Sequence, residues 1–275
     1  MKTILKRFFQ YFVIVVSSMF VLYPLLFTFI TSLKTKEEYI QNPYGICGQE
    51  LTFSNYQKIL SNFNFLEKFT NSAFVVLISI FFIMILSIPS AYYLKKIKNL
   101  GIRTIIILFC FALMFVPEEV IILPEYNMMS KLGLINNFLS VIIIFVSSSL
   151  PEVIFLLYIY MALVPKEIID AARLDGVNEM SCLLYVIIPI LKAPIIVVTI
   201  TTIISLWNSF LVPMLMLYEE EVKLLVPSLS GLITKHSTTP TYQMAGMFLS
   251  MIPIVITYII FKKHIFENSI GGAIK

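Results

Sequence analysis

The sequence predicts an all-α integral membrane protein with six transmembrane helices. Of its 275 residues, 59% are hydrophobic and only 13% are charged, whereas a soluble domain is about half apolar and a quarter charged. The mean hydropathy of +0.91 points the same way, and several apolar runs are long enough to cross a bilayer. These values exclude a soluble enzyme, and the 23 Phe exclude a disordered chain.

Each predicted span is a stretch of about 20 mostly apolar residues, the length that crosses the hydrocarbon core. The six stretches are 10–33, 70–94, 104–123, 141–164, 193–217 and 243–261, within one transmembrane domain over 1–275. The third contains Glu118 and Glu119 near its end, and the fourth contains Glu152. The first follows a basic N-terminus, but it is longer than the apolar part of a signal peptide and no A-x-A-like site follows it. We therefore expect it to be retained as a helix.

The distribution of Lys and Arg predicts the orientation of these spans. With alternating loops assigned to opposite sides, 13 of the 20 basic residues fall on the side that holds both termini. Cytoplasmic loops are enriched in Lys and Arg, so both termini are predicted to be cytoplasmic. This bias of the loops accounts for the net charge of +4. We therefore expect the chain to contact membrane lipid and no nucleic acid. On the opposite side, segment 34–68 is predicted to form a small cap that can meet an extracytoplasmic partner.

Catalytic and cofactor motifs are absent from the chain. It has no G-x-x-x-x-G-K-[ST] loop for ATP and no H-E-x-x-H, C-x-x-C or G-x-S-x-G motif. Cys47, Cys110 and Cys182 are odd in number and far apart, which indicates neither a disulfide framework nor a zinc site. We therefore expect no catalytic residue, metal or bound cofactor here. Energy for transport would come from an ion gradient or from a partner protein.

The cytoplasmic segment 165–189 predicts a short helix followed by a sharp stop. Pro165 is suited to the start of a helix. Gly176 is suited to a left-handed helix end. Asn178 can cap the next helix, which leads into the fifth span.

Residues within this short helix suggest that another surface packs on it. Ala171 and Ala172 are small enough to allow close approach, and Asp170 and Arg173 offer charge. From the pattern alone, two interpretations stay open. The helix either docks a protein or rests on lipid headgroups as an ordinary interfacial helix.

The same segment resembles the E-A-A-x3-G-x9-I-x-L-P motif of ABC-importer permeases. The match keeps every spacing through Asp170, Ala171, Ala172, Gly176, Val186, Ile188 and Pro189, with Leu174-Asp175-Gly176 in place of Ile-Asp-Gly. Further segments resemble the carbohydrate-uptake, maltose-permease branch: 32–35, 51–56, 71–72, 131–137, 206–213 and the tail 271–275. Asp170 replaces the usual Glu, which keeps the charge but shortens its reach.

The resemblance implies the permease subunit of an ATP-driven sugar importer in a bacterial plasma membrane. Helix 166–176 would be the coupling helix, seated on a cytoplasmic ATPase through Asp170, Ala171, Ala172, Arg173, Asp175, Gly176 and Pro189. The implied partners are a second, different permease, two ATPase subunits that carry ATP and Mg, and an extracytoplasmic sugar-binding protein. Closure of the ATPases would switch the spans between inward-facing and outward-facing states.

Polar residues at membrane depth are candidates for the substrate pathway. Glu152 falls near the middle of the fourth span, and Thr201, Ser205 and Asn208 share one face of the fifth at i, i+4 and i+7. Trp207 offers a ring on which a sugar could stack. The alternative interpretation is that these Ser and Thr only pack helices. Glu118 and Glu119 are expected as solvated charges at the outer mouth.

Two other functions fit part of this pattern. One is an ABC permease for a non-sugar solute, against which segments 131–137 and 206–213 argue. The other is an ion-coupled secondary transporter, which needs intramembrane acids. Glu152 is the only deep acid that the predicted spans provide.

Overall fold

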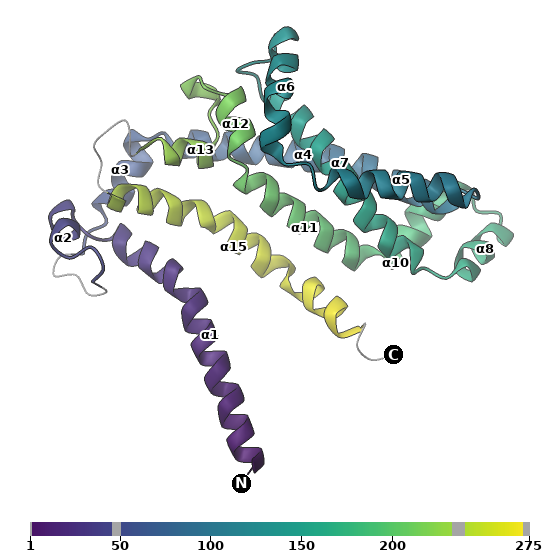
Figure 1. Cartoon of the computed structure of the whole chain (residues 1–275), viewed down its shortest axis with the longest axis horizontal. Coiled ribbons are helices and arrows are strands. Elements are labelled where there is room, and N and C mark those ends of the chain that lie inside the picture. Colours follow the sequence, from purple (N-terminus) through teal and green to yellow (C-terminus); the bar gives the residue numbers. More distant parts are fainter. Residues whose placement is uncertain (1, 46–50, 233–239, 272–275) are drawn as a thin grey trace. The chain divides into compact units, whose positions relative to one another are not determined.

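The computed structural model describes residues 2–45, 51–232 and 240–271, and within these ranges the chain is helical with no strand. Its α-helices are α1 (Lys2–Ser32), α2 (Lys36–Gln41), α3 (Ser54–Asn62), α4 (Phe65–Lys96), α5 (Leu100–Leu113), α6 (Glu118–Lys131), α7 (Phe138–Ala162), α8 (Lys166–Leu174), α9 (Glu179–Cys182), α10 (Ile188–Ile190), α11 (Lys192–Asn208), α12 (Leu211–Met216), α13 (Leu225–Ser230) and α15 (Pro240–Gly271). A π-helix, η1 (Leu183–Ile187), and a 3-10 helix, η2 (Glu220–Val222), complete the described elements (Figure 1). The tail residues 272–275 of the sequence motif, together with Cys47, lie outside the described residues.

In the part of the chain that the structure describes, four helices are long and apolar enough to cross a membrane: Lys6–Ser32 of α1, α4, α7 and Pro240–Lys262 of α15. Two bent pairs raise the number to six if each pair is one span. They are α5 with α6, bent by 94°, and Glu179–Ile190 with α11, bent by 81°. The all-α membrane fold is confirmed.

The chain breaks within both of the straight spans expected at 104–123 and 193–217. After α5, three successive i→i−3 hydrogen bonds tighten the chain, and Pro117 then precedes α6. Proline lacks an N–H and disfavours a helical conformation in the residue before it, which favours a break at this point. α11 ends at Asn208, Ser209 is extended, and the chain restarts as α12.

The described chain divides into two compact units. The first comprises Met1–Phe69 and Leu225–Ile252, and the second comprises Thr70–Leu224 and Pro253–Lys275. Within the first unit, Lys34 is fully buried and its Nζ donates to the backbone oxygens of Asn42 (2.8 Å) and Gly45 (2.7 Å). Asn55 Nδ2 donates to the backbone oxygens of Ser32 (2.8 Å) and Lys34 (2.9 Å). These bonds fold the segment after α1 onto α3.

Tyr56 and Gln243 extend this small polar framework within the first unit. The Tyr56 hydroxyl is hydrogen-bonded to Ser32 Oγ. Burial raises the pKa of Tyr56, and the hydrogen bond with Ser32 partly opposes that rise. Gln243 Nε2 of α15 donates to the Leu229 oxygen of α13 at 3.2 Å. The described residues of segment 34–68 thus include the short helices α2 and α3, and side-chain hydrogen bonds join α3 to the end of α1.

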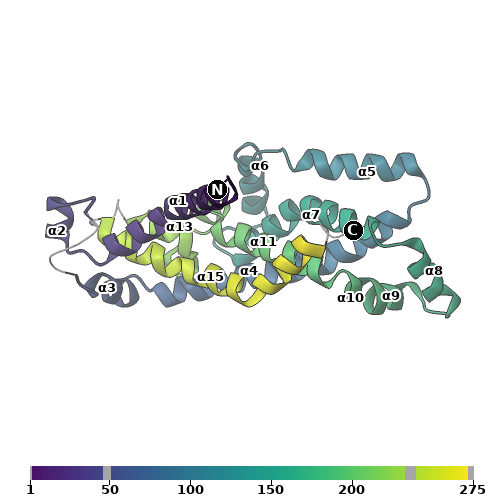
Figure 2. The same cartoon turned by 90° about the horizontal axis from the view of Figure 1, so that it is seen from below.

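α7 is the central helix of the second unit. α5 and α11 both pack on it, and α12 contacts α6 and α7 (Figures 1 and 2). Asn136, with φ of 57°, orders the turn before α7, and its Oδ1 accepts from the Tyr218 (2.8 Å) and Glu219 (3.2 Å) amides. The motif at 131–137 thus joins two loops of this unit and positions the N-terminus of α7.

Candidate functional site

A cavity of about 440 Å³ lies within the second unit, between the end of α5 and helices α6, α7 and α11. This volume is in the range of small-molecule sites, about 300–1,000 Å³. Its polar lining residues are Glu118, Glu125, Ser147, Ser148, Ser149, Glu152, Ser205, Asn208 and Ser209. Among the described residues, three carboxylates and no Lys, Arg or His line it.

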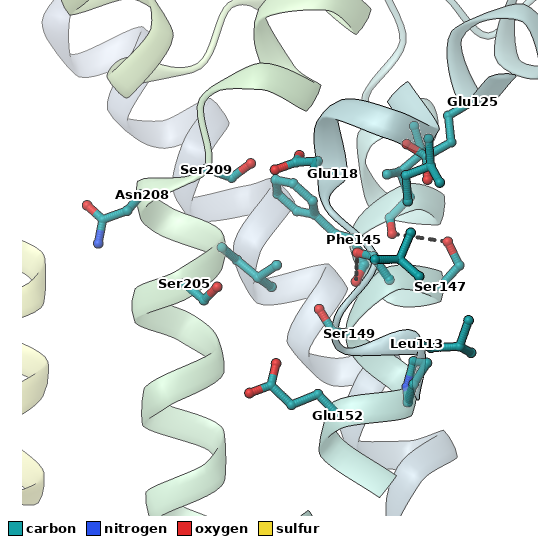
Figure 3. A pocket seen from close by; sticks show the side chains of 16 residues that line it. Leu113, Glu118, Glu125, Phe145, Ser147, Ser149, Glu152, Ser205, Asn208 and Ser209 are labelled. Carbon is teal, nitrogen blue, oxygen red and sulfur yellow. Dashed lines mark hydrogen bonds between the residues drawn. The ribbon is translucent and has the colours of Figure 1, made fainter. Parts of the chain in front are cut away.

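α7 and α11 present most of the hydroxyl and amide groups of the cavity. Figure 3 shows Glu152 and Ser149 of α7 on the side facing α11, from which Ser205 points back toward them. Glu152, Ser205 and Asn208 are exposed in the isolated chain. A polar, open face on helices of a membrane protein is typical of a water-filled path, because exposing it to lipid would cost several kcal/mol per unsatisfied group.

The structure brings together three of the five residues predicted for the pathway. Glu152, Ser205 and Asn208 line the cavity, whereas Thr201 and Trp207 do not. Thr201 is exposed on α11, and its hydroxyl donates to the backbone oxygens of Val197 (3.2 Å) and Val198 (3.0 Å). Trp207 is buried, so its ring is not an open face for a sugar.

The acids of α6 were not predicted as cavity residues. Glu118, expected as a solvated charge at the outer mouth, lines the cavity and accepts a hydrogen bond from the Val212 amide. Glu125 also lines it, and its Oε2 is buried without a hydrogen-bond partner among the described residues. Their spacing of i, i+7 places both on one helical face, which is the signal that could have found them. Across the described ranges, no group of three His, Cys, Asp or Glu is placed to hold a metal ion.

The predicted short cytoplasmic helix is α8, and its ends are built as the sequence indicated. Pro165 precedes its first residue, and Gly176 follows its end with φ of 77°. The Gly176 amide donates to the Arg173 oxygen (3.0 Å) and the Val177 amide to the Ala172 oxygen (3.1 Å), which is a Schellman end. Asn178 Oδ1 then accepts from the Ser181 amide (2.8 Å) and caps α9.

α8 buries one narrow face and exposes the rest. Ile169 and Ala172 are buried, so Ala172 packs on this chain and Ala171 alone of the small pair is open. Asp170, Arg173, Asp175 and Gly176 are exposed, and Asp170 and Arg173 approach to 3.5 Å.

Pro189 lies in α10, at the far end of this segment. It follows the π-helix η1 and precedes the 81° bend into α11. Prolines and π-turns are recurrent causes of helix bends, so η1 and Pro189 together account for this bend.

Helices able to cross a membrane, with a polar cavity between them, define a helical membrane protein with an internal polar site. Residues 65–267 match the model of one family, described as binding-protein-dependent transport system inner membrane components. The chain belongs to this family.

Individual relatives extend the similarity over nearly the whole chain. The multiple sugar-binding transport system permease protein MsmG of Streptococcus mutans is 29% identical over 98% of both chains. The diacetylchitobiose uptake system permease protein NgcG of Streptomyces coelicolor is 25% identical, over 90% of this chain and 82% of that one.

A solved structure has the same fold. It is a bacterial ABC transporter involved in the import of the acidic polysaccharide alginate. The TM-score is 0.78 at 23% identity, covering 94% of this chain and 96% of that one.

Proposed function

We propose that this chain is a permease subunit of an ATP-driven sugar importer in a bacterial plasma membrane. It forms half of the pathway beside a second, different permease. It is not itself catalytic, because ATP hydrolysis belongs to partner ATPases. The observation that carries the proposal is the family match over 65–267, joined to full-length similarity to permeases named for sugar uptake.

The polar cavity supports a role for this subunit in passing a sugar. Serine hydroxyls, an amide and carboxylates are the groups that hydrogen-bond sugar hydroxyls, and Glu152, Ser205 and Asn208 offer them on facing helices. Ser205 and Asn208, exposed on α11, would complete the path against the second permease. Trp207 would support this wall from behind.

The exposed face of α8 supports docking to an ATPase. Asp170, Ala171 and Arg173 would meet the partner, while Asp175, Gly176 and Pro189 shape the turns that present them. The full assembly would contain two ATPases, and an extracytoplasmic sugar-binding protein would meet the cap expected at 34–68.

Reconstitution tests this proposal. The tagged chain is purified with its co-purifying proteins, which are identified by mass spectrometry, and placed in proteoliposomes with a candidate binding protein. Raffinose, melibiose and diacetylchitobiose serve as probes, since relatives are named for these sugars. We expect a second permease, an ATPase and ATPase activity that one sugar stimulates.

Two results would contradict the proposal. ATPase activity that is stimulated by an amino acid or a metal ion, and by none of the sugars, would show that the importer carries a non-sugar solute. A chain recovered as a homodimer, whose uptake collapses with the proton gradient and survives ATP depletion, would make it a secondary transporter.

A further inference from the structure

The last turn of α4 contacts the chain on both sides of α8. Lys95 Nζ donates to the backbone oxygens of Met161 and Val164, at 2.7 Å each. These carbonyls belong to the end of α7, immediately before Pro165 opens α8. Helix C-termini leave carbonyls without helical partners, and a lysine there satisfies them and complements the helix dipole.

The next residue, Lys96, holds the other side of α8. It forms an ion pair with Oε2 of Glu179, the first residue of α9. The Tyr92 hydroxyl donates to the same oxygen at 2.9 Å. The other oxygen, Glu179 Oε1, accepts from Arg173 Nη2 of α8 at 3.2 Å. One carboxylate therefore joins α4, α8 and α9.

The ion pair between Lys96 and Glu179 is partly buried, because the Lys96 side chain is 19% exposed and the Glu179 side chain 47% exposed. Tyr92 is 1% exposed, and Lys96 Nζ lies 4.0 Å from the centroid of its ring and 5.7 Å from that of Tyr93. An isolated exposed ion pair contributes little to stability. Here the Glu179 carboxylate contacts two cations and a hydroxyl, and two aromatic rings flank the Lys96 ammonium, so the groups form a network. α8 itself has only Ile169 and Ala172 buried, so apolar packing alone gives it a small anchor.

We infer that Lys95, Lys96 and Glu179 are positioning residues that tie both ends of α8 to the last turn of α4. The inference rests on the proposed docking of α8 to an ATPase. A displacement of α8 would then move the ends of α4 and α7 together. Because α7 carries Ser147 to Glu152, the displacement would reach the cavity wall through a packed helix.

Distances between spin labels in the purified chain test the tie directly. Labels at Leu86 of α4 and Met180 of α9 occupy exposed positions within the second unit. Double electron–electron resonance in lipid nanodiscs measures the distance between the two labels in the wild-type background, Lys95→Met, Lys96→Met and Glu179→Gln. We expect one narrow distance distribution in the wild type and a broadened one in each variant. Lys98→Met, at an exposed lysine two residues further on, is the matched control and should stay narrow.

Coupling is measured next in the assembled complex. Complex yield, basal ATPase rate and sugar imported per ATP hydrolysed are compared, with the stimulating sugar from the reconstitution as probe. We expect normal yield and basal rate, with import per ATP reduced several-fold in Lys96→Met and Glu179→Gln. Lys96→Arg and Glu179→Asp should restore the ratio, which general loss of folding would not allow.

The outcomes separate this inference from the proposed function. Narrow distributions and wild-type import per ATP in all three variants would overturn the tie, even in a working importer. A wild-type chain that recruits no ATPase would overturn the proposed function, and the label distances would still decide whether the three residues hold α8.

Discussion

At the scale of single residues, the polar side chains of the spans are of two kinds. Some line the cavity, and others form hydrogen bonds with the backbone of their own helix. Glu152 and Ser205 face an open volume, whereas Thr201 returns its hydroxyl to its own helix. Helical spacing alone placed all of them on candidate pathway faces. Only the position of the neighbouring helices separates them, and that position is not encoded in spacing.

Glu152 gives the sharpest test at this scale. A hydrogen bond to a charged group contributes about 1.5–3 kcal/mol, and about 1.4 kcal/mol corresponds to a tenfold change in rate or affinity. Glu152→Ala should therefore lower sugar uptake about tenfold or more with a normal yield of the complex. Thr201→Ala is the control on the facing helix and should keep wild-type uptake. Equal losses in both variants would remove the distinction between the cavity and the rest of the polar face.

Gly176 isolates the backbone contribution to coupling. Its φ of 77° suits glycine, and a Cβ there would meet no atom within 4 Å. Gly176→Ala then costs only the left-handed strain, about 1–2 kcal/mol, and should weaken uptake partially. Gly176→Pro also removes the amide bonded to Arg173 and fixes φ near −65°, so uptake should be abolished.

Membrane insertion of both Gly176 variants is checked by their yield in the membrane fraction, which should match the wild type. Wild-type uptake by Gly176→Pro would contradict a coupling role for the end of α8.

At the scale of elements, apolar runs predicted where helices lie but not where they break. A helix must be long and apolar to cross the lipid core, so the apolar runs of the sequence predict the long helices. Proline alone does not predict a break. Pro117 and Pro189 lie beside the two bends, whereas Pro24, Pro89, Pro151 and Pro253 lie inside continuous helices. Glu125 was not predicted as a cavity residue because the apolar pattern does not show the bend before α6, and this bend directs α6 toward the cavity.

The stability of the turn before α7 can be tested through Asn136. Asn136 contributes two side-chain hydrogen bonds to the 218–219 loop, each with a net stabilisation of about 1 kcal/mol. Asn136→Gly keeps the left-handed backbone and loses both bonds, so the free energy of unfolding should fall by about 2 kcal/mol. Asn136→Asp retains the acceptor and should stay close to wild type. Thermal unfolding in detergent measures both, and an unchanged midpoint for Asn136→Gly would show that the two loops are held by other contacts.

At the scale of the whole molecule, each bent pair either crosses the membrane or returns to the side it entered. Charge distribution favours six crossings with both termini cytoplasmic. If both pairs were re-entrant, only α1, α4, α7 and α15 would cross. The termini would still share one side, so locating them cannot decide between the two arrangements.

Two interior positions do decide, because they exchange sides between the arrangements. With six crossings, Lys131 after α6 is external and Asp175 after α8 is cytoplasmic; with four, Lys131 is cytoplasmic and Asp175 is external. Single cysteines at these positions, in a chain whose Cys47, Cys110 and Cys182 are replaced by Ala, can be labelled with an impermeant maleimide on intact cells. Lys36→Cys and Lys98→Cys serve as controls, external and cytoplasmic in both cases. We expect Lys131→Cys to label at once and Asp175→Cys only after permeabilisation. The reverse pattern would leave α8 outside the cell, where no ATPase could dock.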